Sequence, residues 1–188
     1  MKHRLSLTAV AAAALALSAG TALAAGPVCS AEYERVAGGY EWRGTILADD
    51  GKLYDFEIAS ITEAGAIAAI AAGERGARGA YEALLMAAVE RATVVTPEAI
   101  GELQALIAGA AAADMTIVDG TTGGGTWSIL CFTAPDAATP HSDPVLIERR
   151  GDRTGVNAAA DELRTALIAI DPAFALGPAA TGSKPGPR

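Results

Sequence analysis

The chain has 188 residues, and its 22 acidic and 14 basic side chains give a net charge of −8 at pH 7. Hydrophobic residues make up 51% of the sequence, which is enough to form a buried core. Nucleic acid and anionic membrane surfaces are excluded as partners, because their phosphates repel an acidic protein. The length suits one domain better than two.

The first 24 residues have the pattern of a secretory signal peptide. Lys2 and Arg4 precede an apolar run over residues 5–17 and the small residues of a cleavage site that ends at Ala24. The run is shorter than the roughly 20 residues that a membrane span needs, and no later segment predicts a span. We expect cleavage after Ala24, which removes two basic residues and changes the net charge from −8 to −10. The mature protein is then soluble and exported to the periplasm or the extracellular medium.

Cys29 and Cys131 are the two cysteines of the sequence. In an exported protein such a pair predicts one disulfide, which would join the start of the mature chain to a central strand. The alternative is a reactive thiol, and it is disfavoured because the sequence has no Cys-x-x-Cys motif and no histidine near either cysteine.

Residues 40–48 and 52–58 alternate between apolar and polar side chains. They flank Asp49, Asp50 and Gly51, a combination that predicts a β-hairpin with a bulged turn. The aromatic side chains of the hairpin lie on one face. If this face belongs to the core, it lies under the helices that follow; any exposed part of it would be a binding platform. The side chains on this face are Tyr40, Trp42, Ile46, Tyr54, Phe56 and Ile58.

Helical periodicity follows the hairpin. Residues 62–72 predict a weak helix and residues 73–79 a loop, and an amphipathic stripe predicts a helix over residues 81–92. Thr96 and Pro97 begin a further helix as N-cap and first helical residue. Strands are predicted at 115–118, 127–133 and 144–149, and a last helix runs from an Asn157 cap to Asp171.

This order of elements predicts the α+β class. We expect a mostly antiparallel sheet of four to five strands with helices packed on one face. Residues 25–172 would form a single domain, and the residues from 173 to 188, rich in Pro, Gly and Ser, a disordered tail. We expect a monomer.

The glycine-rich segment 119–125 resembles a phosphate-binding loop in composition alone. Such a loop requires a lysine and a following helix, whereas Trp127 begins a strand-like run here. A flexible connection between two strands is favoured. The alternative is a loop in which Gly123 and Gly124 offer backbone N–H groups to an anion or a partner.

No catalytic or metal-binding set emerges from the motifs. His141 is the single histidine beyond the signal peptide and lies among turn-forming residues, and the sequence has no Gly-x-Ser-x-Gly elbow. Asp55 and Glu57 share one side of a strand, a pattern of exposed surface rather than of a glycosidase pair. We therefore expect no metal and no cofactor.

Arg149, Arg150 and Arg153 form the densest basic cluster of the sequence. A solvated turn is the favoured interpretation. With Arg75 and Arg78 they would alternatively build a site for an anion or a carboxylate.

The sequence favours a non-enzymatic, exported binding or interaction module, with an inhibitor of a secreted enzyme as one form of it. Its partner would be a protein or a small molecule. The alternatives are a small secreted hydrolase around His141, with Asp143 and Glu41 or Asp55 converging on it, and a structural envelope component. The candidate binding residues are Tyr40, Trp42, Gly123, Gly124, Trp127, Arg149, Arg150 and Arg153.

Overall fold

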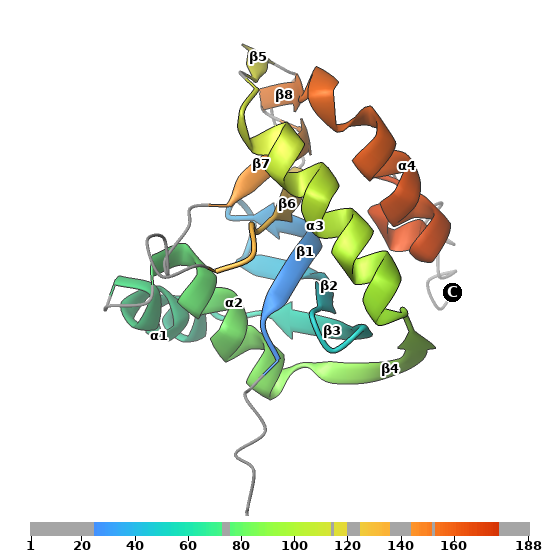
Figure 1. Ribbon diagram of the computed structural model, residues 1–188. Coiled ribbons are helices and arrows are strands. Elements are labelled where there is room, and N and C mark those ends of the chain that lie inside the picture. The colour runs from blue at the N-terminus through green and yellow to red at the C-terminus, as the bar shows by residue number, and fades with distance from the viewer. Residues whose placement is uncertain are drawn as a thin grey trace, which may run out of the picture.

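The computed structural model describes residues 25–72, 76–113, 115–119, 125–135, 144–151 and 153–176. These residues form an antiparallel sheet of eight strands in the order β4-β3-β2-β1-β6-β7-β8-β5 (Figure 1). The strands are β1 (Pro27–Arg35), β2 (Glu41–Ala48), β3 (Lys52–Ile58), β4 (Val89–Val94), β5 (Thr116–Asp119), β6 (Thr126–Cys131), β7 (Val145–Arg150) and β8 (Arg153–Val156). The helices are α1 (Ile61–Ile70), α2 (Gly76–Ala87), α3 (Pro97–Ala111) and α4 (Asp161–Ile170), with short 3₁₀ turns η2 (Ala158–Ala160) and η3 (Pro172–Phe174).

The α+β class and the antiparallel sheet are confirmed, but the predicted strand number of four to five is wrong. Three strands were missed. Strand β1 lies at the centre of the sheet between β2 and β6, β4 forms one edge beside β3, and β8 joins β7 to the other edge strand, β5. The predicted signal peptide lies outside the described residues.

The predicted hairpin is confirmed as β2 and β3. Gly51 sits in the connecting turn with a φ of 80°, a conformation that favours glycine. A Cβ atom at this position would also collide with the backbone carbonyl of Val95. The register pairs Trp42 with Ile58 and Ile46 with Tyr54, so the aromatic side chains lie on one face as expected.

Helices cover both faces of the sheet, so the predicted packing on one face is wrong. On β2 the neighbouring residues Ile46 and Leu47 are both fully buried, which requires a cover on each side because successive strand residues point in opposite directions. Leu47 belongs to a core that includes side chains of α3 and α4, and Ile46 belongs to a second core with α2 and α1. In Figure 1, α3 and α4 lie side by side, away from α1 and α2.

The second predicted helix lies earlier in the chain than its apolar pattern suggested. It begins at Gly76, inside the segment 73–79 that was predicted as a loop. Helix α2 ends at Ala87, and Val89 to Val94 pair with β3 as strand β4. Val89, Thr93 and Val94 are β-branched and therefore favour extended backbone. The edge of β3 supplies main-chain hydrogen-bond partners for this segment. The helix was predicted from the spacing of apolar side chains, which does not take such partners into account.

The third and fourth helices agree with the sequence. Thr96 accepts a hydrogen bond from the backbone N–H of Ala99 and caps α3, whose Leu103 and Ile107 are buried. Asn157 caps the short turn η2 that leads into α4. Phe174 is fully buried in the core.

The burial of Phe174 and Leu176 corrects the domain boundary. The folded part of the chain extends beyond residue 172 to residue 176, because both side chains pack in the core beneath α3 and α4. Residues 177–188, the rest of the predicted tail, lie outside the described part.

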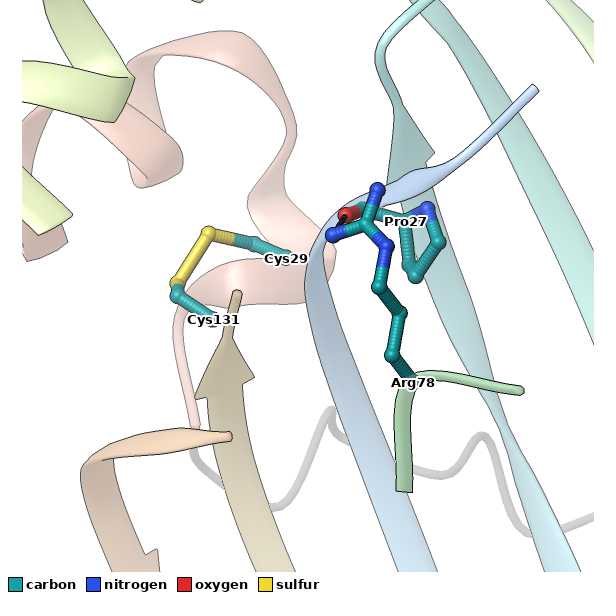
Figure 2. Close-up of a disulfide and its surroundings, with 4 residues drawn as sticks. All are labelled: Pro27, Cys29, Arg78 and Cys131. Atoms are coloured by element: carbon teal, nitrogen blue, oxygen red, sulfur yellow. Dashed lines mark hydrogen bonds between the residues drawn. A yellow bond between two sulfur atoms is a disulfide. The ribbon is translucent and has the colours of Figure 1, made fainter. Parts of the chain in front are cut away.

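The predicted disulfide is confirmed. Cys29 and Cys131 face each other on β1 and β6 with an S–S distance of 2.05 Å (Figure 2). Across β1 from the disulfide, the buried side chain of Arg78 donates a hydrogen bond to the carbonyl of Pro27 at 3.3 Å. A buried structural disulfide indicates an oxidising compartment outside the cytoplasm. Within the described ranges, no helix combines the length and the apolar character needed to cross a membrane.

Replacing both Cys29 and Cys131 by alanine should lower the free energy of unfolding by up to about 4–5 kcal/mol, because the disulfide closes a loop with a separation of 102 residues. Guanidinium chloride unfolding of the variant and of the native protein measures this difference. The far-UV circular dichroism should remain native, since β1 and β6 pair along six residue pairs without the disulfide. A loss of stability below about 1 kcal/mol would contradict the structural role.

Candidate functional site

A groove of about 560 Å³ lies between the sheet and two helices. Strands β1 and β2 form its floor, and α1 and α2 form its walls. Half of α1 is Ala and Gly, so this helix presents little side-chain volume to the sheet and leaves the space open. We call this hollow the α1/α2 groove.

Two residues that the sequence analysis singled out lie in the groove. Tyr40 and Trp42 are both half-buried and line the groove. Tyr40 directly precedes β2, and Trp42 is the second residue of this strand. The Trp42 ring is held edge-on against Phe56, with ring centroids 5.4 Å apart, and against Tyr81, with centroids 6.2 Å apart. The aromatic side chains of the hairpin therefore form a core that remains open at one side. This face is partly core and partly an exposed surface that could bind a ligand.

A carboxyl group lies at the floor of the groove. The Tyr81 hydroxyl donates a hydrogen bond of 2.7 Å to Glu32 Oε2, and the Ser30 hydroxyl donates one of 3.4 Å to the same atom. Trp42 also donates to this carboxyl. Burial disfavours the ionised form and raises the pKa of Glu32 from 4.5 to about 7, although these hydrogen bonds oppose the shift.

The polar groups near Glu32 carry no positive charge. Glu34 lies two residues further along β1 on the same face, and its charge contributes to the raised pKa of Glu32. Burial and the two carboxylates also raise the pKa of Tyr40, and burial with the charge of Glu32 raises the pKa of Tyr81 well above its usual value. Among the described residues, those that line the groove include no Lys, Arg or His.

The third predicted binding aromatic, Trp127, lies on the opposite face of the sheet. Its ring packs against Tyr33 with centroids 4.6 Å apart, and the Arg43 guanidinium stacks over both rings at 5.3 and 5.7 Å. Trp127 borders a second hollow of about 350 Å³ in front of η3, which Asp55 and Glu57 also line.

The carboxyl group of Asp55 is occupied by structural contacts. It accepts a hydrogen bond from the Thr45 hydroxyl at 2.7 Å and pairs with Arg91 at 3.6 Å. Arg91 also pairs with Asp171 at 2.8 Å, so it connects β4 to the start of η3. These contacts hold the C-terminal segment against the edge of the sheet. They give Asp55, Arg91 and Asp171 a structural role that needs no catalytic one.

The arginines of β7 do not converge on a common site. Arg149 and Arg150 are neighbours on a strand and point to opposite faces. Arg150 is paired with the buried carboxylate of Glu148 at 2.6 Å, and Arg164 approaches the same carboxylate at 3.5 Å. Arg78 is buried on the α2 side of β1, where it donates a hydrogen bond to Pro27 and pairs with Glu82 at 3.4 Å.

Several predicted positions lie outside the described residues. These are Gly123, Gly124, Arg75, His141 and Asp143, together with the side chain of Arg153. The hydrolase around His141 therefore stays a prediction. In the described part of the chain, no group of three or more His, Cys, Asp or Glu side chains has a geometry that could hold a metal ion.

Sequence reasoning missed Glu32, the central polar group of the groove. The signal was present: residues 28–34 alternate small or apolar residues with polar ones, a pattern that fits a strand. Tyr81 was recognised as an apolar helix position, but its hydroxyl was given no partner. A buried tyrosine hydroxyl usually finds one, and here it is Glu32.

The chain matches no protein-family model, no curated protein and no solved structure. The geometry of the groove therefore supports the functional argument without help from relatives.

The raised pKa of Glu32 should make the protein less stable as the pH rises from about 4.5 to about 7. In this window the folded protein holds a proton that the unfolded chain releases, so the stability difference across it is up to about 3 kcal/mol. Below the window this contribution is fully present, and above it the contribution is lost. Glu32→Gln cannot ionise and should lack this part of the pH dependence.

Denaturant unfolding of the native protein and of Glu32→Gln over this pH range tests the expectation. The difference between the two curves removes the contribution of the other titrating groups. Parallel curves with a constant offset would show that Glu32 keeps an ordinary pKa.

Proposed function

We propose that the chain is an exported binding module that takes up a small, largely apolar molecule in the α1/α2 groove, in the periplasm or outside the cell. The observation that carries the proposal is the groove itself, with half-buried Tyr40 and Trp42 on one side and a hydrogen-bonded carboxyl, Glu32, on its floor. A concave, mainly apolar site with a few convergent polar groups is the usual form of a small-molecule site.

The size and rim of the groove support a small ligand. Its volume of about 560 Å³ falls within the range of roughly 300–1,000 Å³ that such sites occupy. Val36 and Ile61 stand at the rim, and each is 64% exposed. Two large aliphatic side chains at the mouth of an open groove would be covered when an apolar molecule lies across it.

A binding role is favoured over the two alternatives on physical grounds. A purely structural component gains nothing from an open aromatic groove, because filling it with larger α1 side chains would bury more apolar area. The groove offers two carboxyl groups, Glu32 and Glu34, and its described lining residues include no Lys, Arg, His or Cys that could act beside them as a base, a cation or a thiol nucleophile.

Gly65 offers a direct test, because it lines the groove in the middle of α1 and a Cβ atom there would meet nothing within 4 Å. Gly65→Phe should fill part of the groove without straining the backbone. Binding of N-phenyl-1-naphthylamine, a neutral probe that fluoresces in apolar sites, should weaken at least about tenfold in this variant. Fluorescence titration measures the dissociation constant.

Gly65→Ala is the matched control. It adds a single methyl group, should leave the probe affinity within about twofold, and should stabilise α1 by about 0.5–1 kcal/mol because glycine is a poor helix former. Equal probe binding by the Phe variant, the Ala variant and the native protein would place the probe elsewhere and overturn the proposed site.

A further inference from the structure

We propose that the ligand of the α1/α2 groove is an amphiphilic ammonium ion, with an apolar body along α1 and a positively charged amine at Glu32 and Glu34. This inference rests on the proposed binding function and names the chemical class of its ligand. Its support comes from the charge of the groove, the hydrogen-bonding capacity of Glu32 and the aromatic side chains around it.

The charge of the groove is complementary to a cation. Its described lining residues bring two carboxyl groups, Glu32 and Glu34, and no basic side chain. On this side of the sheet Arg149 lies across β6 from β1 by register, and Arg78 lies on α2, where it contacts Pro27 and pairs with Glu82; neither lines the groove. An ionised Glu32 consequently has hydrogen-bond donors but no counter-charge, and a bound ammonium would supply it.

Glu32 retains room to accept one more hydrogen bond. Tyr81, Ser30 and Trp42 all donate to it, and they occupy three of the roughly four acceptor positions of a carboxylate. A ligand that approaches from the groove must therefore be a donor. An amine meets this requirement, whereas a carboxylate or ether oxygen does not.

The aromatic rings favour the same ligand class. Tyr40, Trp42 and Tyr81 surround the end of the groove that holds the carboxyl groups. A cation within about 6 Å of such rings is attracted by their π-electrons, and the attraction grows when water is excluded. The α1 wall of the groove has apolar side chains such as Ala64, Ile67 and Ala68, which suit an apolar body.

An ammonium ligand should couple its binding to the proton on Glu32. Several groups from four segments face this carboxyl. They are Ser30 and Glu34 on β1, Trp42 on β2 with Tyr40 just before it, Tyr81 on α2 and, by register, Ser128 on β6. The ion pair on α2 between Arg78 and Glu82 lies on the same side of the sheet as Glu32, but the Arg78 guanidinium contacts the carbonyl of Pro27 at the start of β1 and does not line the groove. The hydroxyls of Tyr40 and Tyr81 stay protonated at about pH 8, because their pKa values are raised above their usual value near 10.

The test compares three ligands with the same eight-carbon body: octylammonium, octanol and octanoate. Isothermal titration calorimetry at about pH 8, where Glu32 is ionised, should give octylammonium at least about tenfold tighter binding than octanol, and octanoate should be the weakest. At about pH 5.5 the preference for octylammonium over octanol should largely disappear, because Glu32 is then protonated. Near pH 7, binding of octylammonium should release protons, which titrations in buffers of different ionisation enthalpy detect.

Glu32→Gln separates charge from shape. This variant should keep its affinity for octanol and lose the preference for octylammonium at about pH 8. Glu102→Gln is the matched control: Glu102 is exposed on α3, on the other side of the sheet, so the change removes the same charge without touching the groove. The preference should persist in it.

The outcomes separate this inference from the proposed function. Equal affinity for octylammonium and octanol at about pH 8, or tighter binding of octanoate, would overturn the ammonium inference while the apolar groove stands. A preference for octylammonium that is the same in Glu32→Gln as in Glu102→Gln would reduce it to the overall negative charge and overturn it. Failure of all three ligands and of the neutral probe would overturn both.

Discussion

The structure depends on covering both faces of its central strand, β1. Because side chains alternate along a strand, Cys29 and Ala31 enter the core under α3 and α4, and Ser30 and Glu32 face the layer of α1 and α2. The disulfide from Cys29 to β6 lies on the α3/α4 side of the sheet. The alternating polar residues Ser30 and Glu32 therefore point to the α1/α2 side. A covered face that contains a carboxyl group must provide hydrogen bonds for it.

The groove is the consequence of how that second face is covered. Helix α2 packs closely and brings the Tyr81 hydroxyl to Glu32, whereas the small residues of α1 leave open space above Tyr40 and Trp42. The pKa of this carboxyl group is about 7, because burial disfavours the ionised form and three hydrogen-bond donors stabilise that form. A group balanced in this way responds strongly to any charge that a ligand brings.

Local signals in the sequence were sufficient for elements whose cause is local. The Asp-Asp-Gly turn predicted the hairpin of β2 and β3, and the Thr96 cap with Pro97 predicted the start of α3. Strands β1, β4 and β8 were missed, because a strand is stabilised mainly by partners far away in the sequence. Val89 shows the difference: it fits the stripe of α2, yet the open edge of β3 takes it into a strand.

The sequence by itself determined the α+β class, the disulfide and the set of aromatic residues that could form a platform. These follow from periodicity, turn chemistry and the number of cysteines, which act within short segments or need no geometry. The tertiary structure alone decided that Trp42 joins a groove and Trp127 the opposite face, that Arg149 and Arg150 diverge, and that Glu32 is buried beside Tyr81. Each of these depends on strand order and register, through which residues distant in the chain become neighbours.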